Sequence, residues 1–226
     1  MDSLSSARAL PLQAGDVRSR NRACLGTMLV IVASAPQVII MTGPPGSGKS
    51  TTALELASRL RATLLDQDSM TNPLVDVVAS LIGAAGLDDP RLAALVREPR
   101  YECVHRVVQD CLHAGVSTVV VAPFTAERRD PRAWAELARR IEAHGGTAHL
   151  VWLRISAGEL VRRLRSRSAA RDRAKLADLE GYVASLDLTA PAVPFIEVDS
   201  HEAATLQVAA IQTRLEHDQV TVRTQG

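Results

Sequence analysis

The stretch QVIIMTGPPGSGKS, residues 37–50, decides the fold that this sequence predicts. Residues 37–42 form a short apolar run rich in β-branched side chains, which is typical of a buried strand. Residues 43–50 match G-x-x-x-x-G-K-[ST] at every fixed position, and residues 50–61 carry Leu54, Ala57 and Leu60 at helical spacing. A motif of this kind between a strand and a helix predicts a phosphate-binding P-loop.

The residue types of the loop explain why it should hold a nucleoside triphosphate, ATP or GTP. Glycine permits the backbone conformations in which successive N–H groups point at one anion, and the next helix adds its positive end. Lys49 supplies a charge for the β- and γ-phosphates, and the Ser50 hydroxyl is a ligand for Mg²⁺. The residues expected to bind the nucleotide are Gly43, Pro44, Pro45, Gly46, Ser47, Gly48, Lys49, Ser50 and Thr51.

The composition excludes several classes of protein. A chain of 226 residues with 46% hydrophobic and 23% charged residues fits one α/β domain, as a monomer or homodimer. A net charge of +1 and 3% aromatic residues argue against a nucleic-acid partner. Three cysteines without metal-ligand spacing favour the reducing cytoplasm, and no apolar run is long enough for a membrane span.

The ends of the chain are expected to lie outside the domain at residues 36–217. Residues 1–35 are interpreted as a partly disordered extension, and residues 218–226 as a frayed tail. Within the extension, the apolar run 23–35 after Arg18, Arg20 and Arg22 superficially imitates a secretory signal. Two alternatives are a biological start at Met28 and a short extra strand before the P-loop strand.

The rest of the chain alternates strands with helices. This order predicts the α/β P-loop NTPase fold, with a five-stranded, mostly parallel sheet and helices on both faces. In such a sheet the ligands bind beyond the carboxyl ends of the strands. The expected strands are 37–42, 62–66, 117–122, 147–153 and 195–198, and the expected helices are 49–61, 73–86, 90–98, 99–114, 130–144, 157–168, 176–186 and 201–216.

Two acids, Asp66 and Asp68, follow the second strand. In an extended segment their side chains project to the same side. One can then orient Mg²⁺ or its waters, and the other can take a proton from a substrate hydroxyl. The alternative is that both are turn acids in water, or a cap for the next helix.

GPPGSGKST at 43–51 followed by LLDQDSMTNPL at 64–74 resembles small P-loop kinases that phosphorylate hydroxyls of small molecules. This group includes shikimate and gluconate kinases and enzymes like chloramphenicol 3-O-phosphotransferase. The resemblance implies that Asp66 supports the metal and that Asp68 contacts the substrate as the base. In the chloramphenicol enzymes a single acid at this strand is the base, so the resemblance leaves open which of the two acids it matches.

The same resemblance implies a helical lid rich in arginine, at about 160–176. Residues 160–175 read LVRRLRSRSAARDRAK, and Arg163, Arg167 and Arg171 are four apart, so one continuous helix would place them on one face. Arg167 and Arg171 are interpreted as contacts to the transferred phosphate, with Arg163 behind them as a nucleotide contact. The alternative is a basic face in solvent.

The third strand lacks the terminal acid of a Walker B pattern, so Ser50, Asp66 and waters, or the Thr125 hydroxyl, would support the metal. This absence weakens an interpretation as a motor ATPase or a GTPase switch. Further polar residues that could reach a substrate from the crevice side are Tyr101, His105, Arg106, Arg128 and Arg129.

The leading hypothesis is an enzyme that transfers the γ-phosphate of a nucleoside triphosphate to a hydroxyl of a small molecule. The apolar insert at 71–98 suits a drug-like or nucleoside acceptor, so the resemblance makes antibiotic phosphorylation a specific hypothesis. One rival is a toxin-type kinase of a nucleotide-sugar. The other is a regulatory ATPase that senses nucleotide and has no small acceptor.

Overall fold

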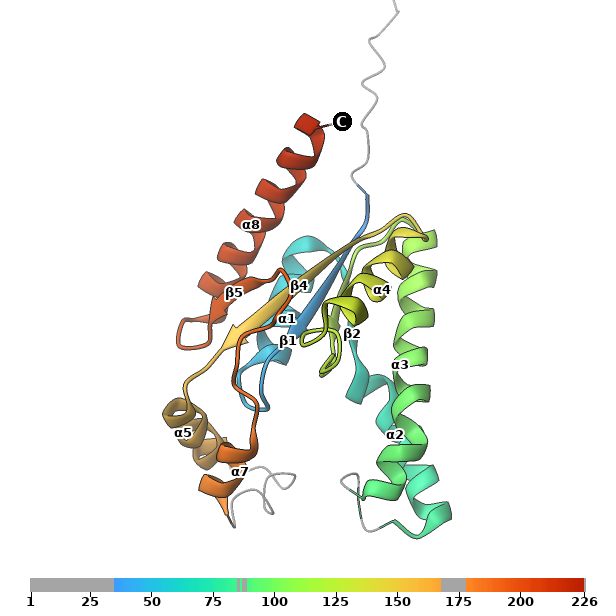
Figure 1. Ribbon diagram of the computed structural model, residues 1–226, viewed down its shortest axis with the longest axis vertical. Coiled ribbons are helices and arrows are strands. Elements are labelled where there is room, and N and C mark those ends of the chain that lie inside the picture. The colour runs from blue at the N-terminus through green and yellow to red at the C-terminus, as the bar shows by residue number, and fades with distance from the viewer. Residues whose placement is uncertain (1–34, 85, 87–88, 168–177, 226) are drawn as a thin grey trace, which may run out of the picture. The chain divides into compact units, whose positions relative to one another are not determined.

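A computed structural model describes residues 35–84, 86, 89–167 and 178–225, which form one compact unit (Figure 1). The expectations for residues 1–34 lie outside this part of the chain. The strands are β1 (Gln37–Thr42), β2 (Thr63–Asp66), β3 (Thr118–Val121), β4 (Thr147–Arg154) and β5 (Ile196–Asp199). The helices are α1 (Lys49–Leu60), α2 (Gln67–Ile82), α3 (Pro90–His113), α4 (Pro131–Glu142), α5 (Ala157–Arg167), α7 (Leu179–Ser185) and α8 (Ala204–Gln225).

The five strands form one parallel sheet in the order β2-β3-β1-β4-β5. β1 lies at the centre, and all six of its residues are buried. A strand that is covered on both faces has apolar side chains on both, which is why the run before the P-loop is apolar without alternation. The predicted α/β fold with helices on both faces of a parallel sheet is confirmed.

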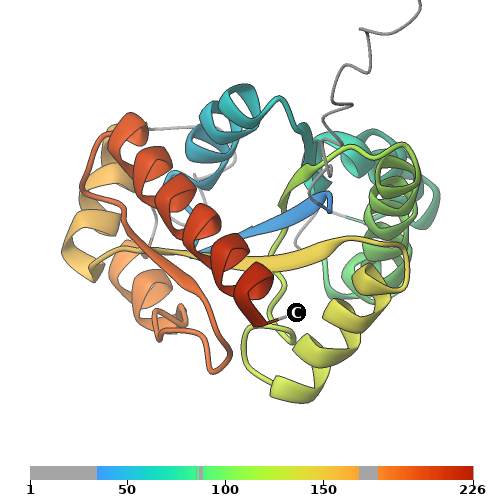
Figure 2. The ribbon, with the colours of Figure 1, turned by 90° about the horizontal axis from the view of Figure 1, so that it is seen from above.

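Two apolar cores lie on the two faces of the sheet, because successive side chains of a strand point to opposite faces. Ile39 and Met41 of β1 pack with α1 and α8, whereas Val38 and Ile40 pack with α3 and α4. Figure 2 shows α1 and α8 on one side of the strands and α3 and α4 on the other. The central strand is therefore fixed from both sides, and with it the loop that follows.

The buried face of α1 differs from the expected one. Leu54, which the helical spacing placed with Ala57, is 61% exposed, and the core side of the helix carries Thr52, Ala53 and Leu56 besides Ala57. The helix is amphipathic, but small residues provide much of its contact with the sheet. Small side chains allow a close approach of the helix to the strands.

The boundaries expected around α2 and α3 are wrong. α2 begins directly after β2 at Gln67, because the Asp66 side chain accepts hydrogen bonds from the N–H groups of Asp68 and Ser69 and so caps the helix. The predicted helices 90–98 and 99–114 are one helix, α3, which begins at Pro90 after the cap residue Asp89 and contains Pro99 in its interior. Packing of α3 along α2 and the sheet outweighs the hydrogen bond that proline removes.

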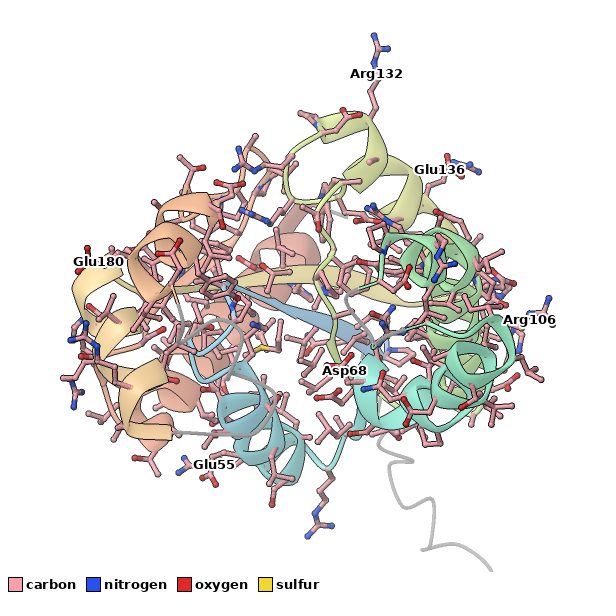
Figure 3. All side chains as sticks on the ribbon, turned by 90° about the horizontal axis from the view of Figure 1, so that it is seen from below. Glu55, Asp68, Arg106, Arg132, Glu136 and Glu180 are labelled. Atoms are coloured by element: carbon pink, nitrogen blue, oxygen red, sulfur yellow. The ribbon has the colours of Figure 1, made fainter. Side chains whose placement is uncertain are left out.

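The last helix is also longer than predicted. α8 covers Ala204–Gln225, so residues 218–225 of the tail that was expected to fray continue the helix. At the carboxyl end of β4, Ser156 caps α5, since its hydroxyl accepts a hydrogen bond from the N–H of Glu159. In Figures 1 and 3, α5 and α7 lie on one side of the carboxyl end of the sheet, and α2 and α3 lie on the other.

Candidate active site

The P-loop forms the turn between β1 and α1, and its glycines are required by its backbone. Gly48 precedes α1 in the left-handed conformation, with φ at 97°. Gly46 has φ at 88°, and a Cβ atom placed there would lie 2.9 Å from Leu160 Cδ1 of α5. A side chain at either position would therefore strain the loop, and at Gly46 it would also push against α5.

Lys49 lies over the loop. Its amine donates hydrogen bonds to the carbonyl oxygens of Gly43 at 2.7 Å and Pro44 at 2.9 Å. One residue further, the Ser50 hydroxyl donates to Asp66 Oδ2 at 3.3 Å, which connects the start of α1 with the end of β2. Ser50 and Asp66, which are sixteen residues apart in the sequence, thus meet at the carboxyl edge of the sheet.

A pocket of about 750 Å³ opens over these residues. The P-loop and the turn from β2 to α2 both line this pocket. Figure 3 shows Asp68 near the middle of the end of the molecule at which the strands have their carboxyl ends. Its lining comprises Gly43, Pro45, Gly46, Gly48, Lys49, Ser50, Thr51, Asp66, Gln67, Asp68, Val121, Ala122, Pro123, Arg163, Leu164 and Ser166. Pro44 and Ser47, also expected at the nucleotide, are buried in the loop.

The two acids lie in the same pocket but not in the extended segment that was expected. Asp66 ends β2 and caps α2, whereas Asp68 belongs to the first turn of that helix. Asp66 therefore fills the alternative role of a cap, through Oδ1, while its other oxygen faces Ser50. The prediction that both acids line one crevice agrees with the structure, although its geometric reason is wrong.

Asp68 has a partner that sequence reasoning missed. Arg100 of α3 donates to Asp68 Oδ1 at 2.5 Å, and the same guanidinium donates to Thr71 at 2.8 Å and to Asn72 at 3.0 Å. The Asp68 side chain is 68% exposed and that of Arg100 is 22% exposed. The arginine is thus fixed against α2 and holds an open carboxylate toward the pocket.

The oxygen atoms of Ser50 and Asp66 fit a magnesium ion. Mg²⁺ prefers oxygen ligands and is usually held by one or two protein groups together with water and phosphate oxygens. Ser50 Oγ and Asp66 Oδ2 lie 3.3 Å apart beside the P-loop, which is close enough for both to face one ion. Thr125, the other hydroxyl considered, is exposed and does not line this pocket.

Arg163 of α5 contacts the P-loop directly. Its guanidinium donates to the Ser47 carbonyl at 3.1 Å, to the Ser200 carbonyl after β5, and to Glu159 at 2.6 Å. Hydrogen bonds from Arg162 and then Arg163 lower the pKa of Glu159 to about 2. The expectations for Arg171 and for the Arg167 side chain lie outside the described residues.

Other polar residues proposed from the sequence lie elsewhere. Arg128 is only 6% exposed and pairs with Asp187, so it is not available to an anionic substrate in this structure. Arg129 pairs with the same carboxylate. Tyr101 and His105 line a second pocket, of about 530 Å³, between α3 and α4, where burial raises the pKa of Tyr101 and lowers that of His105.

The remaining arginine of that group, Arg106, is exposed on α3 and pairs with Glu102 at 2.9 Å.

Among the described residues, no helix is long and apolar enough to cross a membrane.

The central parallel strand, the P-loop and the helix after it define this chain as a protein with the P-loop NTPase fold. Residues 38–189 match the model of a family described as AAA domain, and the chain belongs to this family. A comparison with curated protein sequences finds no significant match.

Solved structures show the same fold in small P-loop kinases. A putative kinase from Chloroflexus aurantiacus is 23% identical, with a TM-score of 0.56 over 81% of this chain and 98% of that one. A gluconokinase from Sinorhizobium meliloti is 18% identical, with a TM-score of 0.56 over 85% of this chain and 99% of that one. An APS kinase from Mycobacterium tuberculosis, in complex with AMPPNP and APS, is 16% identical, with a TM-score of 0.53 over 81% and 99%.

Proposed function

We propose that this protein is a kinase that transfers the γ-phosphate of ATP or GTP to a hydroxyl group of a small molecule. The observation that carries the proposal is the shared pocket, in which the P-loop faces Asp66 and Asp68 across the carboxyl edge of the sheet. Phosphoryl transfer needs a cradle for the phosphates, neutralising charge and a group that positions the nucleophile. The P-loop, Lys49 and the two acids that line this pocket match these three needs and so support the proposal.

Each residue then has a definite task. The P-loop N–H groups and Lys49 bind the β- and γ-phosphates, and the Arg163 guanidinium adds charge from α5. Asp68 accepts the proton of the acceptor hydroxyl, whose oxygen forms the new bond to the γ-phosphorus. The bond from that phosphorus to the bridging oxygen breaks, which leaves a phosphate ester and a nucleoside diphosphate.

Ser50 and Asp66 are the residues that would hold Mg²⁺. When bound, the ion neutralises charge on the β- and γ-phosphate oxygens. Asp66 can serve this purpose without leaving α2, because its two oxygens point to different partners. Arg100 keeps the Asp68 carboxylate turned toward the pocket.

The more specific hypothesis is that the acceptor is an antibiotic and that the enzyme works in the cytoplasm, where nucleoside triphosphates are available. It rests on the resemblance of residues 43–51 and 64–74 to enzymes like chloramphenicol 3-O-phosphotransferase. The apolar residues of α2 give it less support than expected, because Leu74, Val77 and Leu81 are exposed and do not line the pocket.

A screen of acceptors tests the proposal. The purified chain is incubated with Mg²⁺, ATP or GTP, and panels of hydroxylated metabolites, antibiotics and nucleotide-sugars. We expect one acceptor class to gain the mass of one phosphate group, and the identity of that class decides between the antibiotic and the nucleotide-sugar. Hydrolysis of the triphosphate at the same rate with every acceptor, and no phosphorylated product, would instead support a regulatory ATPase.

A further inference from the structure

Tyr101 of α3 holds the backbone of the chain just after β3. Its hydroxyl accepts a hydrogen bond from the N–H of Phe124 at 2.9 Å, and the two rings meet edge to face with their centroids 5.5 Å apart. Phe124 is 1% exposed, so its N–H group is shielded from water. A buried N–H group needs a partner inside the protein, and here that partner is a side chain from a different element.

The backbone at Phe124 is strained, so this hydrogen bond does more than fill space. Its φ is 42°, in the left-handed region that residues other than glycine rarely adopt. Pro123, directly before it, has no N–H group to offer, and the Phe124 carbonyl accepts from the N–H of Arg128 at 3.1 Å. The turn therefore keeps its shape because Phe124 is held at both its N–H and its carbonyl group.

This turn belongs to the wall of the P-loop pocket. Pro123 lines the pocket together with Val121 and Ala122 at the end of β3. Tyr101 is not among the lining residues and opens instead on the second pocket, between α3 and α4. The tyrosine thus supports the wall of the P-loop pocket from behind, without reaching a molecule bound in it.

The residue next to Tyr101 fixes another part of the same pocket. Consecutive side chains of an α-helix project about 100° apart, so Arg100 reaches α2 while Tyr101 packs against the core of the sheet. Arg100 donates to Asp68 at 2.5 Å and to Thr71 at 2.8 Å. One step along α3 therefore connects the Asp68 carboxylate with the turn after β3.

We propose that Tyr101 is a positioning residue for phosphate transfer, whose hydroxyl fixes α3 to the turn after β3 and so sets the place at which Arg100 holds Asp68. The inference rests on the proposed kinase function, in which Asp68 is the base. Without the hydroxyl, the N–H of Phe124 loses its acceptor, the strained turn relaxes, and α3 shifts together with Arg100. Such a shift slows the reaction, because the groups that react must be aligned closely.

Amide hydrogen exchange, followed by NMR in the protein without ligands, is the first test. Tyr101→Phe keeps the ring and removes only the hydroxyl. We expect the N–H of Phe124 to exchange about tenfold faster, which corresponds to one hydrogen bond, and the N–H of Thr71 in α2 to exchange faster too, because Arg100 holds α2 less firmly. The matched control is Tyr182→Phe in α7, the other tyrosine of the chain, which should leave both rates unchanged.

The second test measures transfer from ATP to the acceptor that gains a phosphate group in the screen described above. Tyr101→Phe should lower kcat about tenfold and leave the KM for ATP unchanged, since the P-loop is not affected. In an Asp68→Asn background the same change should have little further effect, because the group that it positions is already lost. A merely structural role of Tyr101 would lower the rate by the same factor in both backgrounds.

The outcomes separate this inference from the proposed function. An unchanged kcat in Tyr101→Phe, or equal losses in the two backgrounds, overturns the role of Tyr101. So does faster exchange at Phe124 with an unchanged rate at Thr71, since the hydroxyl would then hold the turn alone. Failure of the kinase proposal looks different, because the wild type would phosphorylate no acceptor, while the exchange rates, which need neither nucleotide nor acceptor, still decide whether Tyr101 fixes α3 against α2.

Discussion

Asp68 and Arg100 form the residue pair on which the proposed chemistry depends. A carboxylate that takes a proton must stay ionised and must point at the substrate. Arg100 contributes to the second requirement, since it donates to the carboxylate at 2.5 Å while its other hydrogen bonds fix it to Thr71 and Asn72. The pair joins residues thirty-two positions apart on different helices, so no local pattern in the sequence could have predicted it.

Replacing Asp68 by asparagine should reduce phosphate transfer about 10²–10⁴-fold, because the amide keeps the shape of the side chain but cannot take the proton. Nucleotide affinity should change little, since Asp68 lies across the pocket from the P-loop. Steady-state transfer and nucleotide titration measure the two quantities separately. Turnover at the rate of the wild type would show that the base assignment is wrong.

Lys49→Ala should weaken both nucleotide binding and transfer. The amine now donates to the carbonyls of Gly43 and Pro44 and is positioned to reach phosphate oxygens. Loss of a charged hydrogen bond corresponds to about a tenfold or larger decrease in affinity, which calorimetry with ATP would detect. Circular dichroism is the control for folding, and an unchanged Kd would contradict the role of Lys49.

At the start of α5, the negative charge of Glu159 fixes the position of Arg163. Ser156 caps the helix, and Glu159 in its first turn, with a side chain 8% exposed, accepts hydrogen bonds from Arg162 and Arg163. These bonds lower the pKa of Glu159 to about 2 from an ordinary value of 4.5. In the folded protein, Arg162 and Arg163 thus stabilise the Glu159 carboxylate. The same ion pair holds Arg163 in its contact with the P-loop.

Glu159→Gln should flatten the dependence of stability on acid pH. Because the folded pKa lies below the unfolded one, the stabilisation is complete above pH 4.5 and is lost as pH falls from there toward 2. The wild type should therefore lose more of its Tm than Glu159→Gln between pH 6 and pH 3. Thermal melts at a series of pH values measure this, and parallel curves for the two proteins would contradict it.

Elements with a strong local signal could be predicted from the sequence. β1, the P-loop and α1 were found almost to the residue, because an apolar run, three glycines and a helix start all agree there. α2 and α3 were misplaced, since the helix after β2 was expected to begin only at residue 73 although Asp66 caps it directly, and Pro99 was taken as a helix start.

At the scale of the whole molecule, Arg128 connects parts of the chain that are distant in sequence. It follows β3, stacks over the ring of Trp152 in β4 at 4.8 Å, and bonds to Asp187 and to the carbonyl of Thr189 after α7. Its backbone carbonyl accepts from the N–H of Ala192. The segment between α7 and β5 is thereby attached to the middle of the molecule.

Arg128→Met should lower the free energy of unfolding by about 2 kcal/mol, since it removes the side-chain donor of two carbonyl oxygens and one of the donors of the Asp187 carboxylate. This value of about 2 kcal/mol takes into account that the Asp187 side chain is 35% exposed, which weakens its ion pair. Urea denaturation measures the change. Arg129→Met is the matched control, because Arg129 pairs with the same carboxylate but is 42% exposed, and its loss should cost less than about 1 kcal/mol. Equal losses in the two variants would contradict the prediction.

The double use of Asp66 has a consequence for anyone who randomises this pocket in the laboratory. One of its oxygens holds the first turn of α2 and the other faces Ser50. A library that varies Asp66 therefore cannot tell the loss of the helix cap from the loss of the negative charge beside Ser50. Asparagine is as good a helix cap as aspartate but is uncharged. Asp66→Asn therefore separates the contribution of the negative charge from that of the helix start, whereas alanine removes both.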